Sequence, residues 1–184
     1  MNPPAGAEIP EWANQNWLKL PDGSMEVRGG DNRTVKSFGD CKVHVEFRVP
    51  YMPGSGGQGR GNSGVYLQDR YEIQVLDSFG LDMGPGDCGA IYQIAIPPVN
   101  VCLPPLSWQT YDITFRAPRF DASGNKKENG RITVLQNGVK IHDNVELPKT
   151  TGGAAPGEVP LAPLRLQDHG NPVRFRNIWV QEIR

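Results

Sequence analysis

Apolar and polar side chains alternate along the segment 61–77, which reads GNSGVYLQDRYEIQVLD. Successive side chains of an extended chain point to opposite faces, so this segment sorts its residues into two sets. The apolar set consists of Val65, Leu67, Tyr71, Ile73 and Val75. The polar set consists of Tyr66, Gln68, Arg70, Glu72 and Gln74. The alternation predicts β-structure with one face in the core and an unbroken polar stripe on the other.

A sheet face that carries an arginine, a glutamate and several amides offers donors and acceptors at fixed positions. Sugar hydroxyls need partners of this kind, so the stripe favours a carbohydrate ligand. Arg70 and Glu72 lie two residues apart on the same face. They can belong to a site or only form an ion pair with each other, and the sequence leaves both interpretations open.

The composition favours an all-β fold. The 184 residues suffice for one domain with a full core. The 22 glycines and 17 prolines lie between the apolar runs, as turn residues do, and no apolar stripe of helical spacing is present. We predict an all-β jelly-roll sandwich of two antiparallel sheets over residues 17–184, preceded by an N-terminal arm over residues 1–16.

Several further strands are expected from the same alternation. They cover residues 41–49, 108–117, 131–136, 139–141, 164–169 and 173–183. The pair Asn137-Gly138 is a strong hairpin signal, and a second hairpin is expected around residues 21–24. The glycine-rich segment 51–61 is interpreted as a mobile connection or a flap over the stripe. The irregular segment 78–107 is expected to pack across one end of the sheet.

The charge balance argues against several partners. Lys and Arg number 19 against 20 acidic residues, a formal charge of −1, which attracts neither nucleic acid nor an anionic membrane. No run of about 18 apolar residues exists, so no membrane span is expected. The first residues lack the basic and apolar parts of a secretion signal, although a mature chain would have lost such a signal.

The three cysteines fall into two groups. Cys41 alternates with apolar residues and is expected to be a small core residue. Cys88 and Cys102 flank one loop-rich segment, and the sequence leaves open whether they form a disulfide or remain thiols. A disulfide would indicate maturation in an oxidising compartment.

Several pieces of the chain together resemble the 3-keto-disaccharide hydrolase domain family. They are FGDCKVHVEFR, GNSGVYLQDRYEIQVLDS, CGAIY with the later NVCLPP, WQTYDITFRAPRFD, and LRLQDHGNPVRFRNIWV, in order over most of residues 20–182. The resemblance implies the concanavalin-A-like lectin/glucanase sandwich. It also implies a bacterial, exported protein, extracellular or periplasmic, that acts on glycosides or disaccharides already oxidised to a ketone at sugar carbon 3.

Two departures qualify what the resemblance implies. The family more often has an aromatic residue at the position of Cys41, which concerns core packing only. The segment 72–77 is similar to the E-x-D-x-x-E signature of laminarinase-type retaining β-glucanases, with Glu72 kept, Gln74 in place of the Asp and Asp77 in place of the last Glu. A retaining enzyme needs two carboxyl groups about 5–5.5 Å apart, whereas Glu72 and Asp77 would face opposite ways in a regular strand. The sequence therefore argues against ordinary double displacement.

A 3-keto sugar offers another route, because its ketone acidifies the hydrogen on carbon 2. Elimination of the group on carbon 1 then needs a base, an acid near the glycosidic oxygen and a group that stabilises enolate charge. Glu72 is the expected base, and Arg70 either polarises the ketone or only holds Glu72 in place. His169 is expected to act as acid, base or metal ligand; the alternative is a turn histidine bonded to backbone.

The remaining candidates would bind the substrate or a metal. The expected substrate-binding residues are Gln68, Gln74, Gln167, Asn62 and Tyr66. A divalent metal held by some of His44, Glu46, Glu72 and His169 is conceivable, although no ligand spacing demands one. The main alternative to an enzyme is a non-catalytic, lectin-like carbohydrate-binding module, since this fold serves both kinds of protein. A structural interaction domain is a third class, and the sequence does not indicate an oligomeric state.

Overall fold

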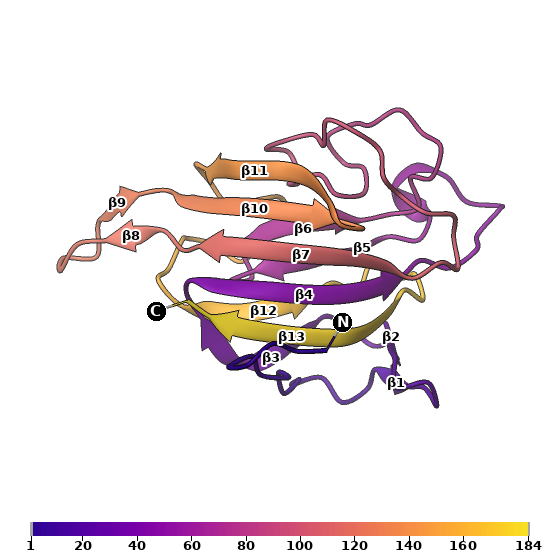
Figure 1. Cartoon of the computed structure of the whole chain (residues 1–184), viewed down its shortest axis with the longest axis horizontal. Coiled ribbons are helices and arrows are strands. Elements are labelled where there is room, and N and C mark those ends of the chain that lie inside the picture. Colours follow the sequence, from indigo (N-terminus) through magenta and orange to yellow (C-terminus); the bar gives the residue numbers. More distant parts are fainter. Residues whose placement is uncertain (1, 184) are drawn as a thin grey trace.

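Two antiparallel sheets pack face to face in the computed structural model, which describes residues 2–183 (Figure 1). The sheet in front in Figure 1 has the order β1-β2-β13-β4-β7-β10-β11. Its strands are β1 (Leu18–Lys19), β2 (Met25–Glu26), β4 (Cys41–Arg48), β7 (Gln109–Arg116), β10 (Gly130–Gln136), β11 (Val139–Leu147) and β13 (Arg174–Glu182). The sheet behind it has the order β3-β12-β5-β6, with β3 (Asn32–Phe38), β5 (Ser63–Leu67), β6 (Tyr71–Val75) and β12 (Ala162–Leu166).

The core lies between the facing sides of these two sheets. Val43, Val45 and Phe47 of β4 point into it because they alternate with polar residues on the outer face. The rings of Tyr71 on β6 and Phe115 on β7 join the two sheets, with centroids 5.6 Å apart. The all-β sandwich predicted from the sequence is confirmed, and the described residues contain only one short 3₁₀ turn, η1 (Gly57–Gly59).

The segment 61–77 forms a hairpin and not one continuous stripe. β5 and β6 pair from Ser63↔Val75 to Leu67↔Tyr71, and the chain reverses at Gln68 and Asp69. Both turn residues have positive φ, 52° and 57°, as a type I′ hairpin turn requires. The reversal carries Gln68 and Arg70 away from the face that Tyr66, Glu72 and Gln74 share.

β3 is a strand that the alternation did not reveal. Its buried positions include Asn32 and Thr34, while Val35 is exposed, so its hydrophobic pattern is inverted locally. The two inward polar side chains are satisfied by hydrogen bonds. Asn32 exchanges hydrogen bonds with the backbone of Asn14, and the hydroxyl of Thr34 bonds to Lys36 O and Leu164 N.

The segments outside the two sheets lie along their edges and ends. The arm joins the sandwich through isolated bridges that pair Glu8 with Val180 and Trp12 with Thr34. A short ribbon of β8 (Arg119–Phe120) and β9 (Lys126–Glu128) projects from one end, and the loops of segment 78–107 cover the other (Figure 1). Among residues 2–183, no helix has the length and apolar character needed to cross a bilayer.

The three cysteines are buried thiols in this structure. The sulfur atoms of Cys88 and Cys102 lie 3.5 Å and 3.4 Å from the same nitrogen, Nε2 of Gln136. The disulfide that the sequence left open is therefore not formed here, although the two side chains are neighbours.

Candidate active site

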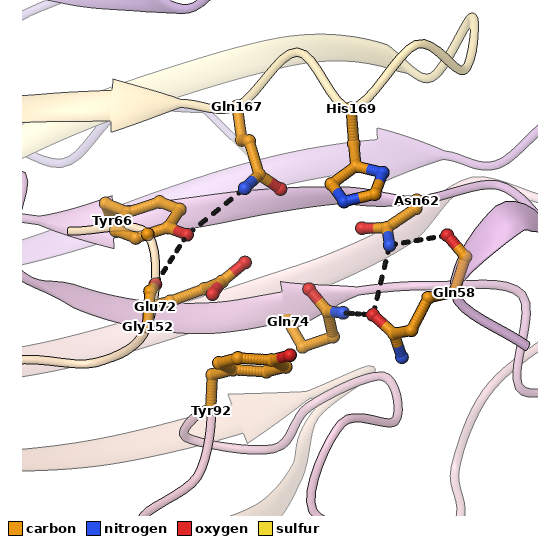
Figure 2. Close-up of a pocket in the computed structure, with 10 residues that line it drawn as sticks. Gln58, Asn62, Tyr66, Glu72, Gln74, Tyr92, Gly152, Gln167 and His169 are labelled. Carbon is orange, nitrogen blue, oxygen red and sulfur yellow. Dashed lines mark hydrogen bonds between the residues drawn. The ribbon is translucent and has the colours of Figure 1, made fainter.

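A pocket opens on the outer face of the four-stranded sheet, on the side away from the core (Figure 2). Its floor is Tyr66 of β5 with Glu72 and Gln74 of β6, which alternate with core residues on the same strands. The cavity measures about 170 Å³, a size that suits one sugar ring better than a chain. Its lining consists of Gln58, Asn62, Tyr66, Glu72, Gln74, Tyr92, Gly152, Gly153, Gln167 and His169.

Two loops form walls by bonding to the free edge of β6. Tyr92 N donates to Glu72 O (3.1 Å), and Gln74 N donates to Ala90 O (3.0 Å). On the same edge, Thr151 N donates to Arg70 O (2.9 Å), and the Thr151 hydroxyl accepts from Glu72 N (3.0 Å). The ring of Tyr92 and the backbone of Gly152 and Gly153 are therefore held beside the floor by regular backbone pairing.

Glu72 is the ionisable group at the centre of the floor. Only 3% of its surface is exposed. Burial raises the pKa of the Glu72 carboxyl to about 7, while the nearby Tyr66 hydroxyl and the charge of Arg165 pull the pKa in the opposite direction. Near neutral pH this carboxyl can therefore both accept and give up a proton.

Arg165 of β12 is the cation that acts on Glu72. Its guanidinium lies 3.6 Å from the centroid of the Tyr66 ring and forms ion pairs with Asp69 (2.8 Å) and Asp31 (3.2 Å). It also donates to Gly153 O (2.9 Å). With 6% of its side chain exposed, Arg165 lies behind Tyr66 and supports both the floor and the Gly153 wall.

The pocket is rich in acceptors that have no protein partner among residues 2–183. The side-chain oxygens Oδ1 of Asn62, Oε1 of Gln74 and Oε1 of Gln167 are buried and receive no hydrogen bond. Buried polar atoms are normally paired, so three acceptors without a protein partner at one cavity suit a ligand that supplies donors. Sugar hydroxyls are donors of this kind.

The loop after β12 brings two of the predicted residues to the pocket rim. Asp168 fixes this loop, because its backbone N–H donates to Asp31 and its carboxyl accepts from the backbone of Gly30 and Gly170. Gln167 and His169, on either side of Asp168, line the pocket, and Gln167 Nε2 donates to the Tyr66 hydroxyl (3.2 Å). Figure 2 shows both side chains directed toward the cavity.

Two of the predicted residues lie outside the pocket. Arg70 donates to the carbonyls of Gly157 (2.9 Å) and Gln68 (3.1 Å), so it holds the 156–157 loop rather than Glu72. Gln68 is buried and donates to Phe38 O and Pro160 O. Arg70 and Gln68 lie outside the pocket because the chain reverses at Gln68 and Asp69. The polar face that Tyr66 belongs to on β5 therefore continues on β6 only at Glu72.

Three further candidates, Asp77, His44 and Glu46, also lie outside the pocket. Asp77 follows β6 and forms an ion pair with Arg60 (3.3 Å). His44 and Glu46 lie on the outer face of the seven-stranded sheet, where His44 contacts Asp112 (2.6 Å) and Glu46 pairs with Arg176 (2.6 Å). They are thus separated by the whole sandwich from Glu72 and His169, and these four residues cannot form one metal site. Across the described chain, no three His, Cys, Asp or Glu side chains gather as a ligand set.

Sequence reasoning missed Gln58, Tyr92 and Arg165. For Arg165 a signal was present, because it shares one strand face with Gln167 and His169 by alternation. Gln58 and Tyr92 come from irregular segments, and neither lies in a pattern that could place it at the pocket.

A buried carboxyl group whose pKa is raised to about 7, set among amides and aromatic rings on a β-sandwich, is a site suited to a carbohydrate ligand. The family comparison agrees: the model of the 3-keto-alpha-glucoside-1,2-lyase-like domain matches residues 6–181. The chain belongs to this family, and the resemblance seen in the sequence is confirmed.

One solved structure agrees with this family assignment, and more distant ones share the fold. A provisionally assigned glycosyl hydrolase from Parabacteroides distasonis ATCC 8503 is 35% identical, with a TM-score of 0.84 over 94% of this chain and 78% of that chain. A second such protein from the same organism is 19% identical, with a TM-score of 0.65 over 97% and 94% of the two chains. The carbohydrate-binding module CBM66 from Bacillus subtilis shares the fold at 12% identity, with a TM-score of 0.56 over 93% and 95%. None of the curated proteins matches this chain.

Proposed function

We propose that this protein cleaves glycosides whose sugar carries a ketone at carbon 3, with Glu72 as the base that removes the proton on carbon 2. The observation that carries the proposal is the buried Glu72 carboxyl, with a pKa of about 7, on the floor of a pocket of about 170 Å³. A base whose pKa lies near the working pH is available and strong enough to act. Membership of the family supports an activity of the glycosyl-hydrolase type.

The reaction would proceed by elimination and hydration. Glu72 takes the carbon-2 proton, and the electron pair of that C–H bond forms an enolate with its charge on the ketone oxygen. When the ketone re-forms, a double bond appears between carbons 1 and 2, and the bond from carbon 1 to the glycosidic oxygen breaks. The departing oxygen keeps the electron pair of that bond and takes up a proton. Water then adds across the double bond, with its hydroxyl on carbon 1 and a hydrogen on carbon 2.

The other lining residues would assist these steps. His169 at the rim is the proposed donor to the departing oxygen, since histidine is the side chain that most often serves as a general acid. Gln167 has a second N–H beyond the one donated to Tyr66, and Tyr92 contributes a hydroxyl group; both are neutral donors for enolate charge. Arg70, bonded to loop carbonyls outside the pocket, has no part in this scheme.

A carbohydrate-binding module without catalysis is the second candidate. It is favoured by the three orphaned amide oxygens, which would serve an unmodified sugar as well as an oxidised one. The two functions differ in what they require of Glu72: the enzyme needs its proton chemistry, and the module needs only its hydrogen bonds.

Incubation with 3-keto-glucosides and their unoxidised parents tests the proposal. We expect release of the aglycone from the keto sugars only, and deuterium at carbon 2 when the reaction runs in D₂O. The variant Glu72→Gln should lose at least about 100-fold in rate, the usual contribution of a general base. Parallel reactions with and without a chelator test whether the activity depends on a divalent metal.

The matched control is Glu128→Gln, which changes an exposed glutamate on β9 far from the pocket and should leave the rate unchanged. Sugar binding without turnover, equal in the wild type and in Glu72→Gln, would establish the binding module instead.

A further inference from the structure

The side-chain amides of Asn62 and Gln74 are turned the same way by a third amide, that of Gln58. Asn62 Nδ2 and Gln74 Nε2 both donate to Oε1 of Gln58, at 3.1 Å and 2.9 Å (Figure 2). Their nitrogens therefore face Gln58, and their oxygens are left to the cavity, where both are buried and unpaired.

Two backbone carbonyls fix this orientation. Gln58 O accepts from Asn62 Nδ2 (2.7 Å), and Gly86 O accepts from Gln58 Nε2 (2.8 Å) and from Gln74 Nε2 (3.2 Å). A carbonyl oxygen can only accept a hydrogen bond, so reversing any of the three amides would set two oxygens against each other. The direction of every amide in the group follows from these two backbone atoms.

Gly86 makes room for this arrangement. A Cβ at position 86 would lie 3.1 Å from Nε2 of Gln58, which is closer than ordinary contact. Gln58 itself lies on the exposed turn η1, so its side chain contributes to the pocket wall and not to the core.

We infer that Asn62 and Gln74, oriented by Gln58, form an acceptor-only wall that determines which edge of the sugar can bind there. Two hydroxyl hydrogens of the ligand satisfy the two oxygens. A ketone oxygen has only lone pairs and is rejected. It would leave both wall oxygens without a donor and would place a third acceptor oxygen against them.

This inference rests on the proposed function for its substrate and adds the orientation of that substrate. The ketone at carbon 3 turns away from the acceptor-only wall and toward the second N–H of Gln167 and the hydroxyl of Tyr92, and Glu72 stays ionised to act as the base. The same orientation of the sugar places the neighbouring carbon-2 hydrogen beside Glu72, the proposed base.

Deoxyfluoro sugars test the wall, since fluorine replaces a hydroxyl in size but has no hydrogen to donate. Protein labelled with ¹⁵N is titrated with methyl glucoside and with its deoxy and deoxyfluoro analogues, and binding is followed at the side-chain amides of Asn62 and Gln74. At two ring positions we expect the fluoro analogue to bind at least about ten-fold more weakly than the hydroxyl parent, and no better than the deoxy analogue.

Two variants at position 58 separate orientation from bulk. In Gln58→Lys the ammonium can only donate, and its charge-assisted hydrogen bonds are stronger than the neutral ones to Gln58 O and Gly86 O. It should therefore draw the oxygens of Asn62 and Gln74 toward itself and reduce the preference for hydroxyl over fluorine to less than about three-fold. Gln58→Met has similar length and no donor. Because Gln58 O and Gly86 O still hold the amides in this variant, it should keep the wild-type preference.

The outcomes distinguish the inference from the function on which it rests. Equal binding of hydroxyl and fluoro sugars by the wild type, or an unchanged preference in Gln58→Lys, overturns the inference even if keto sugars are turned over. The expected pattern without turnover supports the wall and contradicts the proposed reaction. No binding of any sugar, the 3-keto-glucosides included, overturns both.

Discussion

The carboxyl group of Glu72 lies directly over the backbone of Gly64, in the space that a side chain at position 64 would fill. A Cβ built there would lie 3.0 Å from Cδ of Glu72 and 2.9 Å from Cε2 of Tyr66, and would overlap Oε1 of Glu72. A glycine in the middle of β5 weakens a strand, so its place here follows from the close approach of the carboxyl group.

Gly64→Ala should therefore displace the Glu72 carboxyl. We expect a loss of about 1–3 kcal/mol in the free energy of unfolding, as for other overpacked sites, and at least a ten-fold loss of activity on keto sugars. Denaturant unfolding and initial rates measure the two effects. Gly54→Ala is the matched control, because a Cβ at position 54 has no atom within 4 Å. Unchanged activity in Gly64→Ala would contradict this account.

The raised pKa of Glu72 predicts how stability depends on pH. Between the ordinary value of 4.5 and about 7 the unfolded chain releases this proton and the folded protein keeps it. The contribution of Glu72 to stability is thus fully present below pH 4.5 and is lost as pH rises through 7. The full loss amounts to about 3 kcal/mol.

Glu72→Gln cannot titrate and should lack this loss. Urea unfolding at pH 5, 7 and 9 should show the wild type falling relative to Glu72→Gln by an amount that grows with pH, whereas Glu128→Gln should follow the wild type. If stability changed with pH in the same way in all three proteins, the pKa of Glu72 would be close to its ordinary value of 4.5.

Arg165→Met tests the support behind Tyr66. It would leave Asp69, which is 6% exposed, with Arg33 as its remaining cationic partner, and we expect a loss of about 3 kcal/mol in stability. Because Arg165 lowers the pKa of Glu72, its removal should also raise that pKa above 7, which ¹³C NMR of the carboxyl would detect. The control Arg33→Met changes a side chain that is 40% exposed and should cost no more than about 1 kcal/mol.

The cysteines give a count that can be checked directly. Three thiols should react with a disulfide reagent after unfolding, because all three cysteines are free. In the native protein at pH 8 the reaction should be slow, since each thiol is buried and burial raises the pKa of Cys41 to about 12. A single reactive thiol after unfolding would show that Cys88 and Cys102 had been oxidised to a disulfide.

Local pattern was enough to predict the sandwich and part of the pocket. Alternation placed Val65, Ile73 and Val75 in the core, and the Asn137-Gly138 turn forms as expected, with φ of 51° and 79°. The same alternation explains why Glu72 and Gln74, on the opposite face of β6, do share one cavity.

Tertiary contacts decided what the pattern could not. Gln68 and Asp69 are not a standard hairpin pair, and their turn is held from outside: Gln68 donates to Pro160 O, and Asp69 pairs with Arg33 and Arg165. A single sequence does not reveal partners so far along the chain. The acceptor-only wall has the same origin, since its direction is set by Gly86 O in a loop without regular pattern.

The pairing of the wall loops with β6 has a consequence for solubility. β6 ends the four-stranded sheet, and an uncovered edge strand of this kind invites pairing with another chain. Ile91 forms a bridge to Ile73, and Thr151 bonds to Arg70 O, so the segments that shape the pocket also shield this edge from self-association. Shortening either loop to widen the substrate range would then show itself first as aggregation, which light scattering detects before any change in sugar preference is measured.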